Sequence, residues 1–307
     1  MLLLCYAKIN LTLEIVSKRP DGFHELASLV HTVSLADELG IERAPKLATY
    51  VTGMDPDPEA NLVSRAAALL AARLDRGDGA NLSLVKHIPA AAGLGGGSSD
   101  AAATLAGLSS LWNARLRPSR LHAMAAELGS DVPYFVQGGA ALMRGRGDEL
   151  VPLPPLRDQW LVLLAPSHTF ADKTRRLYAA LEPRDFSKGD VTRQAAERLA
   201  RGQPLNEDEL VNGFERAARR VFPGLDELWR TTESASGRRL FLSGAGPALF
   251  TLVASRAEAH EVAARLARPE ARTFAVRTVK HARIASRRGH RVRLSATCAC
   301  DCPVVQR

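Results

Sequence analysis

The 307-residue sequence lacks a hydrophobic stretch long enough to cross a bilayer, so we expect no membrane-spanning helix and no membrane partner. Its first residues, MLLLCYAKINL, have no basic region before a long apolar segment. We therefore expect no signal peptide, although residues 2–5 weakly resemble a lipoprotein cleavage site. Cysteine is scarce: three of the four lie together at Cys298, Cys300 and Cys302, which is no spaced disulfide framework. A packed protein of the reducing cytoplasm is the expectation.

An excess of positive charge is also absent from most of the chain, despite a net charge of +8. Residues 272–307 hold nine Lys or Arg and one Asp, which leaves 32 basic and 32 acidic residues in the remainder. A basic end of this kind is usually a solvated segment, so it gives little support for a nucleic-acid partner. The tail cysteines could bind a soft metal, but a fourth ligand is missing, and we expect unstructured thiols instead.

Alternating apolar and polar residues predict the first strand. Residues 8–15 alternate as in a half-buried strand, which places Lys8 and Asn10 on one face. Residues 19–22 (RPDG) have turn chemistry, so Phe23 and His24 should open a returning strand. An alanine-rich helix is expected over residues 62–75, capped by Asn61.

A second unit is expected after the prolines at 152, 154 and 155, because a new hydrophobic strand starts at Trp160–Ala165. Further along, two apolar runs flank a tight turn and predict a hairpin. Its parts are Leu240–Leu242, Ser243–Pro247 and Leu249–Val253, followed by a helix after Ser255 and a last strand at Thr273–Val279. The predicted units are residues 1–152 and 153–285, followed by a basic, disordered tail over 286–307.

The glycine-rich stretch PAAAGLGGGSSDAAA, residues 89–103, follows a predicted strand at 80–88 and precedes a predicted helix at Ser99–Leu116. Glycines let backbone N–H groups approach a ligand closely, and a helix N-terminus adds unpaired donors, so the stretch is typical of a phosphate site. It matches neither the Walker pattern, which needs a Lys after the last glycine, nor the dinucleotide fingerprint, where Ser98 replaces the third glycine. For a generic glycine cluster, a tight connection without a ligand would be the alternative.

Four further motifs accompany this loop. In chain order they and the loop are Ala7–Leu11 (AKINL), Asp21–Leu26 (DGFHEL), Pro89–Ala102, Gly129–Phe135 (GSDVPYF) and Ser243–Pro247 (SGAGP). The loop resembles the phosphate-binding motif of the galactokinase, homoserine, mevalonate and phosphomevalonate (GHMP) kinase superfamily. The ordered set is similar to the branch that phosphorylates a cytidine diphosphate-linked methylerythritol for the non-mevalonate isoprenoid pathway. The resemblance spans about residues 5–283 and leaves out the tail.

The resemblance implies an α/β (α+β), two-domain GHMP kinase fold, with a ribosomal-S5-domain-2-like N-terminal domain and a ferredoxin-like C-terminal domain. It implies ATP and Mg²⁺ as cofactors, with the metal ligands unknown, and a small-molecule substrate, the cytidine diphosphate-linked methylerythritol. Asp131 would accept the hydroxyl proton, and Lys8 would keep that carboxylate ionised and stabilise charge on the transferring group.

The remaining site residues also follow from the resemblance. ATP would contact Pro89, Ala90, Ala91, Ala92, Gly93, Leu94, Gly95, Gly96, Gly97, Ser98 and Ser99, with Asn61 and Leu62 in the adenine pocket. The acceptor would contact Asn10, Phe23, His24, Thr174, Tyr178, Gly244 and Gly246. Phe23 and Tyr178 would stack on the two faces of cytosine, because a planar base gains from aromatic neighbours.

Each functional role has a structural alternative. Asp131 could be only a helix cap, Lys8 a solvated strand lysine, and His24 a structural histidine. For the whole chain, the alternatives are another GHMP kinase, of homoserine or mevalonate type, or a non-catalytic sensor or RNA-binding relative. We expect a monomer or a weak homodimer.

Overall fold

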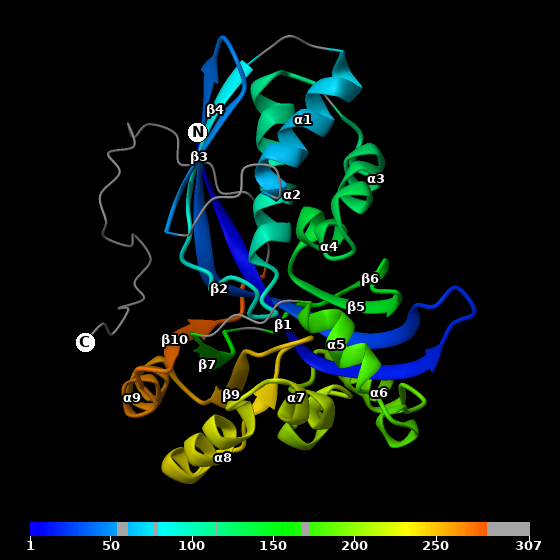
Figure 1. Cartoon of the computed structure of the whole chain (residues 1–307), viewed down its shortest axis with the longest axis vertical. Coiled ribbons are helices and arrows are strands. Elements are labelled where there is room, and N and C mark those ends of the chain that lie inside the picture. The colour runs from blue at the N-terminus through cyan, green and yellow to red at the C-terminus, as the bar shows by residue number, and fades with distance from the viewer. Residues whose placement is uncertain (54–60, 76–78, 115, 157, 168–171, 281–307) are drawn as a thin grey trace.

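The structure is a computed structural model of the whole chain (Figure 1), and it describes all residues except 54–60, 76–78, 115, 157, 168–171 and 281–307. The predicted tail, with its three clustered cysteines, therefore lies outside the described residues. Among the described residues, none of the helices combines the length and the apolar character that spanning a bilayer would require.

The N-terminal half is a mixed sheet with helices on one face (Figure 1). Its strands run in the order β3-β4-β2-β5-β6, with β1 also paired to β2, and all pairs are antiparallel except β3 with β4. The strands are β1 Leu2–Lys18, β2 His24–Ala44, β3 Ala48–Thr52, β4 Gly79–Val85, β5 Ala140–Gly145 and β6 Glu149–Leu153. The helices are α1 Leu62–Leu74, α2 Gly96–Leu111, α3 Pro118–Leu128 and α4 Val132–Gln137.

The C-terminal half is an antiparallel sheet in the order β10-β7-β9-β8. Its strands are β7 Trp160–Pro166, β8 Phe241–Leu242, β9 Leu249–Val253 and β10 Ala271–Arg277. The helices are α5 Lys173–Ala179, α6 Asp190–Ala200, α7 Glu215–Val221, α8 Leu225–Ser236 and α9 Arg256–Arg265. Helices lie between β7 and β8 and between β9 and β10, which is the strand–helix–strand–strand–helix–strand order of a ferredoxin-like fold. The expected fold class is confirmed.

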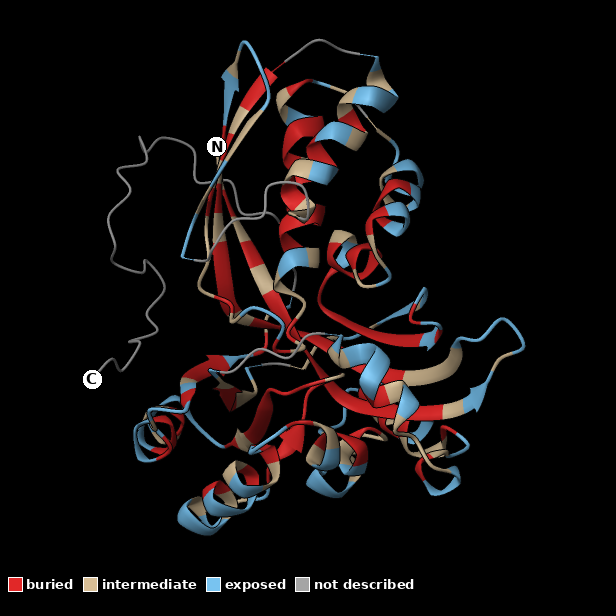
Figure 2. Cartoon of the chain, in the orientation of Figure 1, coloured by how far each residue is buried: buried red, intermediate tan, exposed pale blue. Residues whose placement is uncertain are grey.

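The strands change sheet between Leu153 and Trp160, so β6 ends one residue past the predicted boundary at 152. The two halves nevertheless share a core, because β1 passes from one to the other. Leu3 packs with the N-terminal helices, Ile9 with strands of the C-terminal sheet, and Ile15 with α7 and α8. The buried residues of β1 form a continuous band through the middle of the molecule (Figure 2).

The half-buried strand expected over residues 8–15 is wrong in one respect: its polar face is buried as well, with Glu14 only 6% exposed. The Glu14 carboxylate accepts hydrogen bonds from the Ser187 hydroxyl and the Thr192 N–H, both at 2.7 Å, so chain from beyond β7 covers this face. The sequence pattern shows that the face is polar, but packing from the other half decides that it is dry.

The glycine-loop helix begins earlier than expected. Helix α2 starts at Gly96 instead of Ser99, with Gly95 as its N-cap, and ends at Leu111. Other elements fall close to the predictions, including α1, where the Asn61 side chain accepts the Val63 N–H at 2.9 Å. Because Gly96 is the first helical residue, the glycine stretch is itself the start of the helix, and its N–H groups point out of the helix end.

Candidate active site

The glycine loop has a backbone that only glycine allows at two positions. Gly93 and Gly95 have φ angles of +86° and +72°. A Cβ on Gly93 would lie 2.7 Å from the Ser243 carbonyl oxygen, and one on Gly95 would lie 2.6 Å from the Phe135 ring. Both approaches are too close for a side chain. The glycine loop is therefore pressed against the second glycine turn, which joins β8 to β9.

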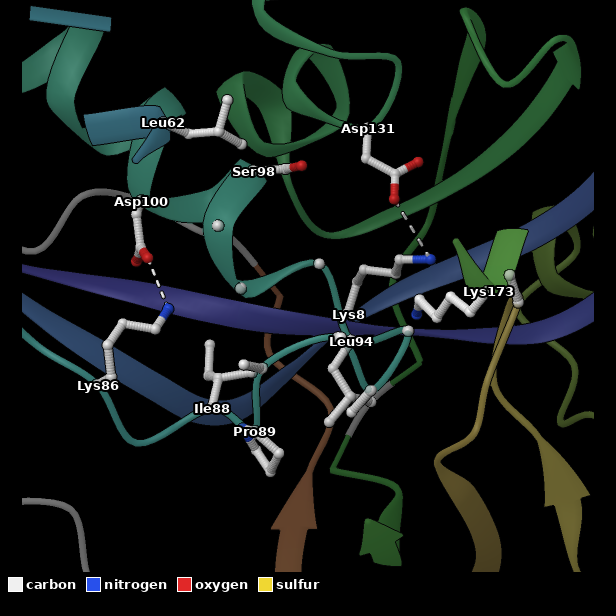
Figure 3. Close-up of a pocket in the computed structure, with 18 of the residues that line it drawn as sticks. Lys8, Leu62, Lys86, Ile88, Pro89, Leu94, Ser98, Asp100, Asp131 and Lys173 are labelled. Carbon is white, nitrogen blue, oxygen red and sulfur yellow. Dashed lines mark hydrogen bonds and ion pairs between the residues drawn. The ribbon is translucent and has the colours of Figure 1, made fainter. Parts of the chain in front are cut away.

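A cavity of about 520 Å³ opens beside the loop and the start of α2. Its wall combines the glycine loop with side chains from both halves of the chain (Figure 3). The lining residues are Lys8, Asn61, Leu62, Leu84, Lys86, Ile88, each residue from Pro89 to Ser98, Asp100, Asp131, Lys173, Thr174 and Ala245. Backbone N–H groups at a helix start carry partial positive charge, so this wall suits an anionic polyphosphate.

Lys8 reaches this cavity from the middle of β1. The register with β2 shifts between Tyr6 and Lys8 and again between Asn10 and Thr12, and such bulges re-aim neighbouring side chains. The Lys8 N–H donates to the Leu94 carbonyl at 2.9 Å, which ties the strand to the glycine loop. Its Nζ donates to Asn10 Oδ1 at 2.6 Å. Lys8 is thus a fixed cation with a buried side chain, unlike a solvated strand lysine.

Asp131 faces Lys8 across the cavity (Figure 3). It occupies the N-cap position of α4, yet its side chain makes no capping hydrogen bond with any described residue. One of its carboxylate oxygens instead lies 3.7 Å from Lys8 Nζ, and the side chain is 38% exposed compared with 6% for Lys8. The helix-cap alternative therefore does not account for this carboxylate, which is left open to the cavity.

Lys173, which the sequence analysis did not single out, also points into this region (Figure 3). Its Nζ donates to the Gly246 carbonyl at 2.7 Å. Burial, together with repulsion from Lys8, lowers the pKa of Lys173 to about 8, although the charge of Asp131 acts in the opposite direction. The only sequence signal was its position directly before Thr174.

Lys86 and Asp100 form a second charged cluster at the far end of the same cavity (Figure 3). Lys86 Nζ donates to Asp100 at 2.6 Å and also to Asp37, which in turn accepts the Ile88 N–H at 2.8 Å. Burial, with repulsion from Asp37, raises the pKa of Asp100 to about 7. Sequence reasoning missed this cluster because Asp37 is distant in the chain and lies in a strand without motif character.

Of the residues expected to recognise the acceptor, Thr174 lines the cavity. His24 and Tyr178 form a stacked pair, with ring centroids 4.5 Å apart and planes at 23°. Phe23 is 54% exposed, and its ring lies under the Arg146 guanidinium at 4.8 Å. The ring against Tyr178 is therefore His24, and stacking of Phe23 on cytosine stays a prediction.

The second glycine turn, Ser243–Pro247, packs closely against the side chains of Lys8 and Asn10. A Cβ on Gly244 would lie 2.7 Å from Asn10 Oδ1 and 3.2 Å from Lys8 Nζ. The Asn10 amide donates to Ser28 Oγ at 2.7 Å, which fixes its oxygen toward Lys8. Ser99 is buried, and its N–H donates to the Gly95 carbonyl at 2.9 Å, so it belongs to α2 and not to the cavity wall.

Two family models match the chain. Residues 61–139 match the GHMP kinases N terminal domain, and residues 189–271 match the GHMP kinases C terminal domain. The first includes the glycine loop and Asp131, and the second includes the turn that carries Gly244. The chain is therefore a GHMP kinase.

Individual relatives narrow the class. A 4-diphosphocytidyl-2-C-methyl-D-erythritol kinase from Dehalococcoides mccartyi is 42% identical over 85% of this chain and 92% of its own length. One from Gloeobacter violaceus is 39% identical over 85% of this chain and 88% of its own. A crystal structure of 4-(cytidine 5'-diphospho)-2C-methyl-D-erythritol kinase superposes with a TM-score of 0.78 and 36% identity, covering 91% of this chain and 99% of the other. The chain belongs to the family of 4-diphosphocytidyl-2-C-methyl-D-erythritol kinases.

The other superfamily branches are more distant. A homoserine kinase from Cytophaga hutchinsonii has a TM-score of 0.66 over 91% of this chain and 94% of its own, but only 18% identity, so it shares the fold alone. The homoserine- or mevalonate-type alternative is not favoured, and neither is a non-catalytic relative.

Proposed function

We propose that the chain transfers the γ-phosphoryl group of ATP to the 2-hydroxyl of 4-diphosphocytidyl-2-C-methyl-D-erythritol, a step of isoprenoid precursor synthesis. The observation that carries this proposal is the Lys8–Asp131 pair, 3.7 Å apart in a cavity walled by the glycine loop. A phosphotransferase must align the hydroxyl, neutralise charge and accept one proton, and this pair can do the last two.

Asp131 acts as the general base in this proposal. Its exposed carboxylate can accept the hydroxyl proton as the acceptor oxygen bonds to phosphorus and the bond to the bridging oxygen of the nucleotide breaks. Lys8 favours the ionised carboxylate and offers positive charge to the transferring group. Asn10 holds the Lys8 ammonium in place at 2.6 Å, so little reorganisation is needed.

The nucleotide fits the wall of the cavity. The phosphates suit the N–H groups of the glycine loop and the start of α2, while Asn61 and Leu62 flank the place expected for adenine. Mg²⁺ would neutralise phosphate charge when bound. Among the described residues, no group of three or more His, Cys, Asp or Glu side chains could hold a metal, so the phosphate oxygens of the nucleotide are its proposed ligands.

The acceptor is proposed to bind along α5 and the start of β2. Thr174 lies at the cavity, and the His24–Tyr178 stack offers flat surfaces and a mixed donor and acceptor for a pyrimidine. The cytoplasmic location and the monomer or weak homodimer stay predictions, and the first agrees with a need for ATP.

The test is a panel of alcohols with ATP and Mg²⁺, measured by ADP release and by identification of the phosphorylated product. The panel contains diphosphocytidyl-methylerythritol, homoserine and mevalonate. We expect turnover with the first alone and a product phosphorylated at its 2-hydroxyl. Turnover of homoserine or mevalonate with none of the cytidylyl compound would overturn the proposal.

A further inference from the structure

We propose that Lys173 is a second catalytic cation, which contacts the transferring γ-phosphoryl group. The inference rests on the proposed kinase reaction and assigns a residue outside the Lys8–Asp131 pair. Lys173 is the first residue of α5, from the C-terminal half of the chain, whereas Lys8 and Asp131 come from the N-terminal half.

Lys173 is held without a neutralising partner. Within the described part of the chain, its ammonium donates to the Gly246 carbonyl at 2.7 Å and forms no ion pair with a carboxylate. Lys8 and Asp131 line the same cavity, and their charges act on the Lys173 ammonium. Two ammonium groups in one partly buried cavity repel each other, and an anion bound between them relieves this repulsion. Lys8 and Lys173 are therefore arranged to bind the negative charge of a ligand.

The position of Lys173 indicates which phosphate it contacts. It lines the same cavity as the glycine loop, Lys8 and Asp131, whereas His24 and Tyr178 do not line this cavity. The γ-phosphoryl must pass between the nucleotide and the hydroxyl, that is, beside Asp131. The phosphates of the acceptor lie nearer its cytidine, so the γ-phosphoryl is the group that Lys173 meets.

The bonds that form and break, and the proton transfer, do not involve Lys173. The hydroxyl oxygen bonds to phosphorus, the bond to the bridging oxygen breaks, ADP leaves with that electron pair, and Asp131 receives the proton. Charge spreads over the oxygens of the transferring group, and Lys173 stabilises it together with Lys8. Lys173 neither gives nor takes a proton in this step.

The experiment compares Lys173→Gln with Lys173→Arg and with Lys188→Gln, which removes an exposed lysine elsewhere. Calorimetry measures the Kd of a non-hydrolysable ATP analogue, of ADP and of CDP, each with Mg²⁺. We expect Lys173→Gln to weaken the analogue about tenfold and to change ADP and CDP less than about twofold, since only the analogue has a γ-phosphate. Its kcat/KM for ATP should fall on the order of 10- to 100-fold. Lys173→Arg should recover most of the analogue affinity, and Lys188→Gln should match the wild type.

Other results would overturn the inference. Equal losses for ADP and the analogue would show that Lys173 only supports the Gly246 turn, and a loss for CDP would assign it to the acceptor phosphates. Unchanged affinity of Lys173→Gln for the ATP analogue would show that Lys173 does not contact the γ-phosphate. If the wild-type protein does not phosphorylate the cytidylyl acceptor, the proposed function fails, while the comparison of ATP analogue with ADP still decides the role of Lys173.

Discussion

The cavity has a lysine–carboxylate cluster at each end, and the two clusters differ in charge balance and in access (Figure 3). At one end, Lys8 and Lys173 face a single carboxylate, Asp131, which is 38% exposed. At the other end, Lys86 faces two carboxylates, Asp37 and Asp100, whose side chains are 0% and 3% exposed. We call these the open cluster and the closed cluster.

The difference separates a reactive role from a structural role. The open cluster has surplus positive charge beside the glycine loop and a carboxylate that solvent and ligand can reach, which suits an incoming polyphosphate. In the closed cluster, both carboxylates accept hydrogen bonds from the Lys86 ammonium, which links β2 and α2 to the residue that follows β4. The Lys86 ammonium also packs against the start of α2, since a Cβ on Gly96 would lie 3.2 Å from Lys86 Nζ. The lysines and carboxylates of the two clusters therefore have different roles, catalytic in one and structural in the other, because their charge balance and solvent exposure differ.

The largest expected effect is on stability, in the closed cluster. Lys86→Met leaves two buried carboxylates without their cation and should lower the free energy of unfolding by about 3–5 kcal/mol. The matched change in the open cluster, Lys8→Met, should lower it by less than about 1 kcal/mol, because Asp131 remains solvated. Urea denaturation measures both.

Acid should reduce the Lys86→Met deficit. Burial and repulsion from Asp37 raise the pKa of Asp100 from its ordinary value of 3.8 to about 7, and loss of the Lys86 charge, which lowers it, should raise this pKa further. The folded variant therefore binds this proton over a wider pH range than the folded wild type and gains more stability as the pH falls. The deficit should therefore shrink from pH 8 to pH 5. Equal losses of stability in Lys86→Met and Lys8→Met would erase the distinction between the clusters.

The next effect is on catalysis, in the open cluster. Asp131→Asn keeps the size of the side chain but removes the base, and should lower turnover on the order of a hundredfold or more. Lys8→Ala should also cut turnover severely, and the double variant should lose much less than the product of the single losses. Steady-state kinetics, with calorimetric binding of substrate and an ATP analogue, measure these effects.

The nearly unchanged binding expected for Asp131→Asn is the control for folding. If Asp131→Asn has turnover close to that of the wild type, Asp131 is not the general base, and catalysis comes from the positioning of the substrates. Losses that multiply fully in the double variant would mean that Lys8 and Asp131 act independently.

A smaller effect is expected from pH. The pKa of Lys173 lies at about 8, below its ordinary value of 10.5, so its charge is present below about pH 8 and is lost as the pH rises through that value. The kcat/KM for ATP should fall about tenfold above pH 8 in the wild type. Lys173→Arg keeps its charge and should stay flat over this range. A fall of the same size in both proteins would assign the titration to another group.

The smallest effect concerns charge far from either cluster. Deleting residues 286–307 removes five of the 41 basic residues but none of the cavity lining. Turnover should stay within about threefold, roughly 0.7 kcal/mol in the barrier, because local charge governs the reaction. A collapse of activity in a folded truncated protein, judged by its melting temperature, would show that the tail belongs to the site.

Much of the site could be predicted from local pattern. The strand–glycine loop–helix order and the shared face of Lys8 and Asn10 depend on neighbours in sequence, whereas Asp131 was singled out by the motif around it. The start of α2 was placed three residues late, since glycine is a poor helix former in general, yet Gly96 is the first residue of this helix.

The sequence by itself determined the phosphate-binding character of the glycine loop and the order of the elements, because turn chemistry, capping and alternation are short-range properties. The candidate pair of Lys8 and Asp131 followed from the resemblance of the ordered motifs to the GHMP kinases. Tertiary structure alone decided that the polar face of β1 is dry, that Lys173 meets Lys8 and that Lys86 is neutralised by Asp37. These features arise from charges and surfaces that are distant along the chain. Their energies depend on the separation and desolvation of the charges, which only the packed molecule sets.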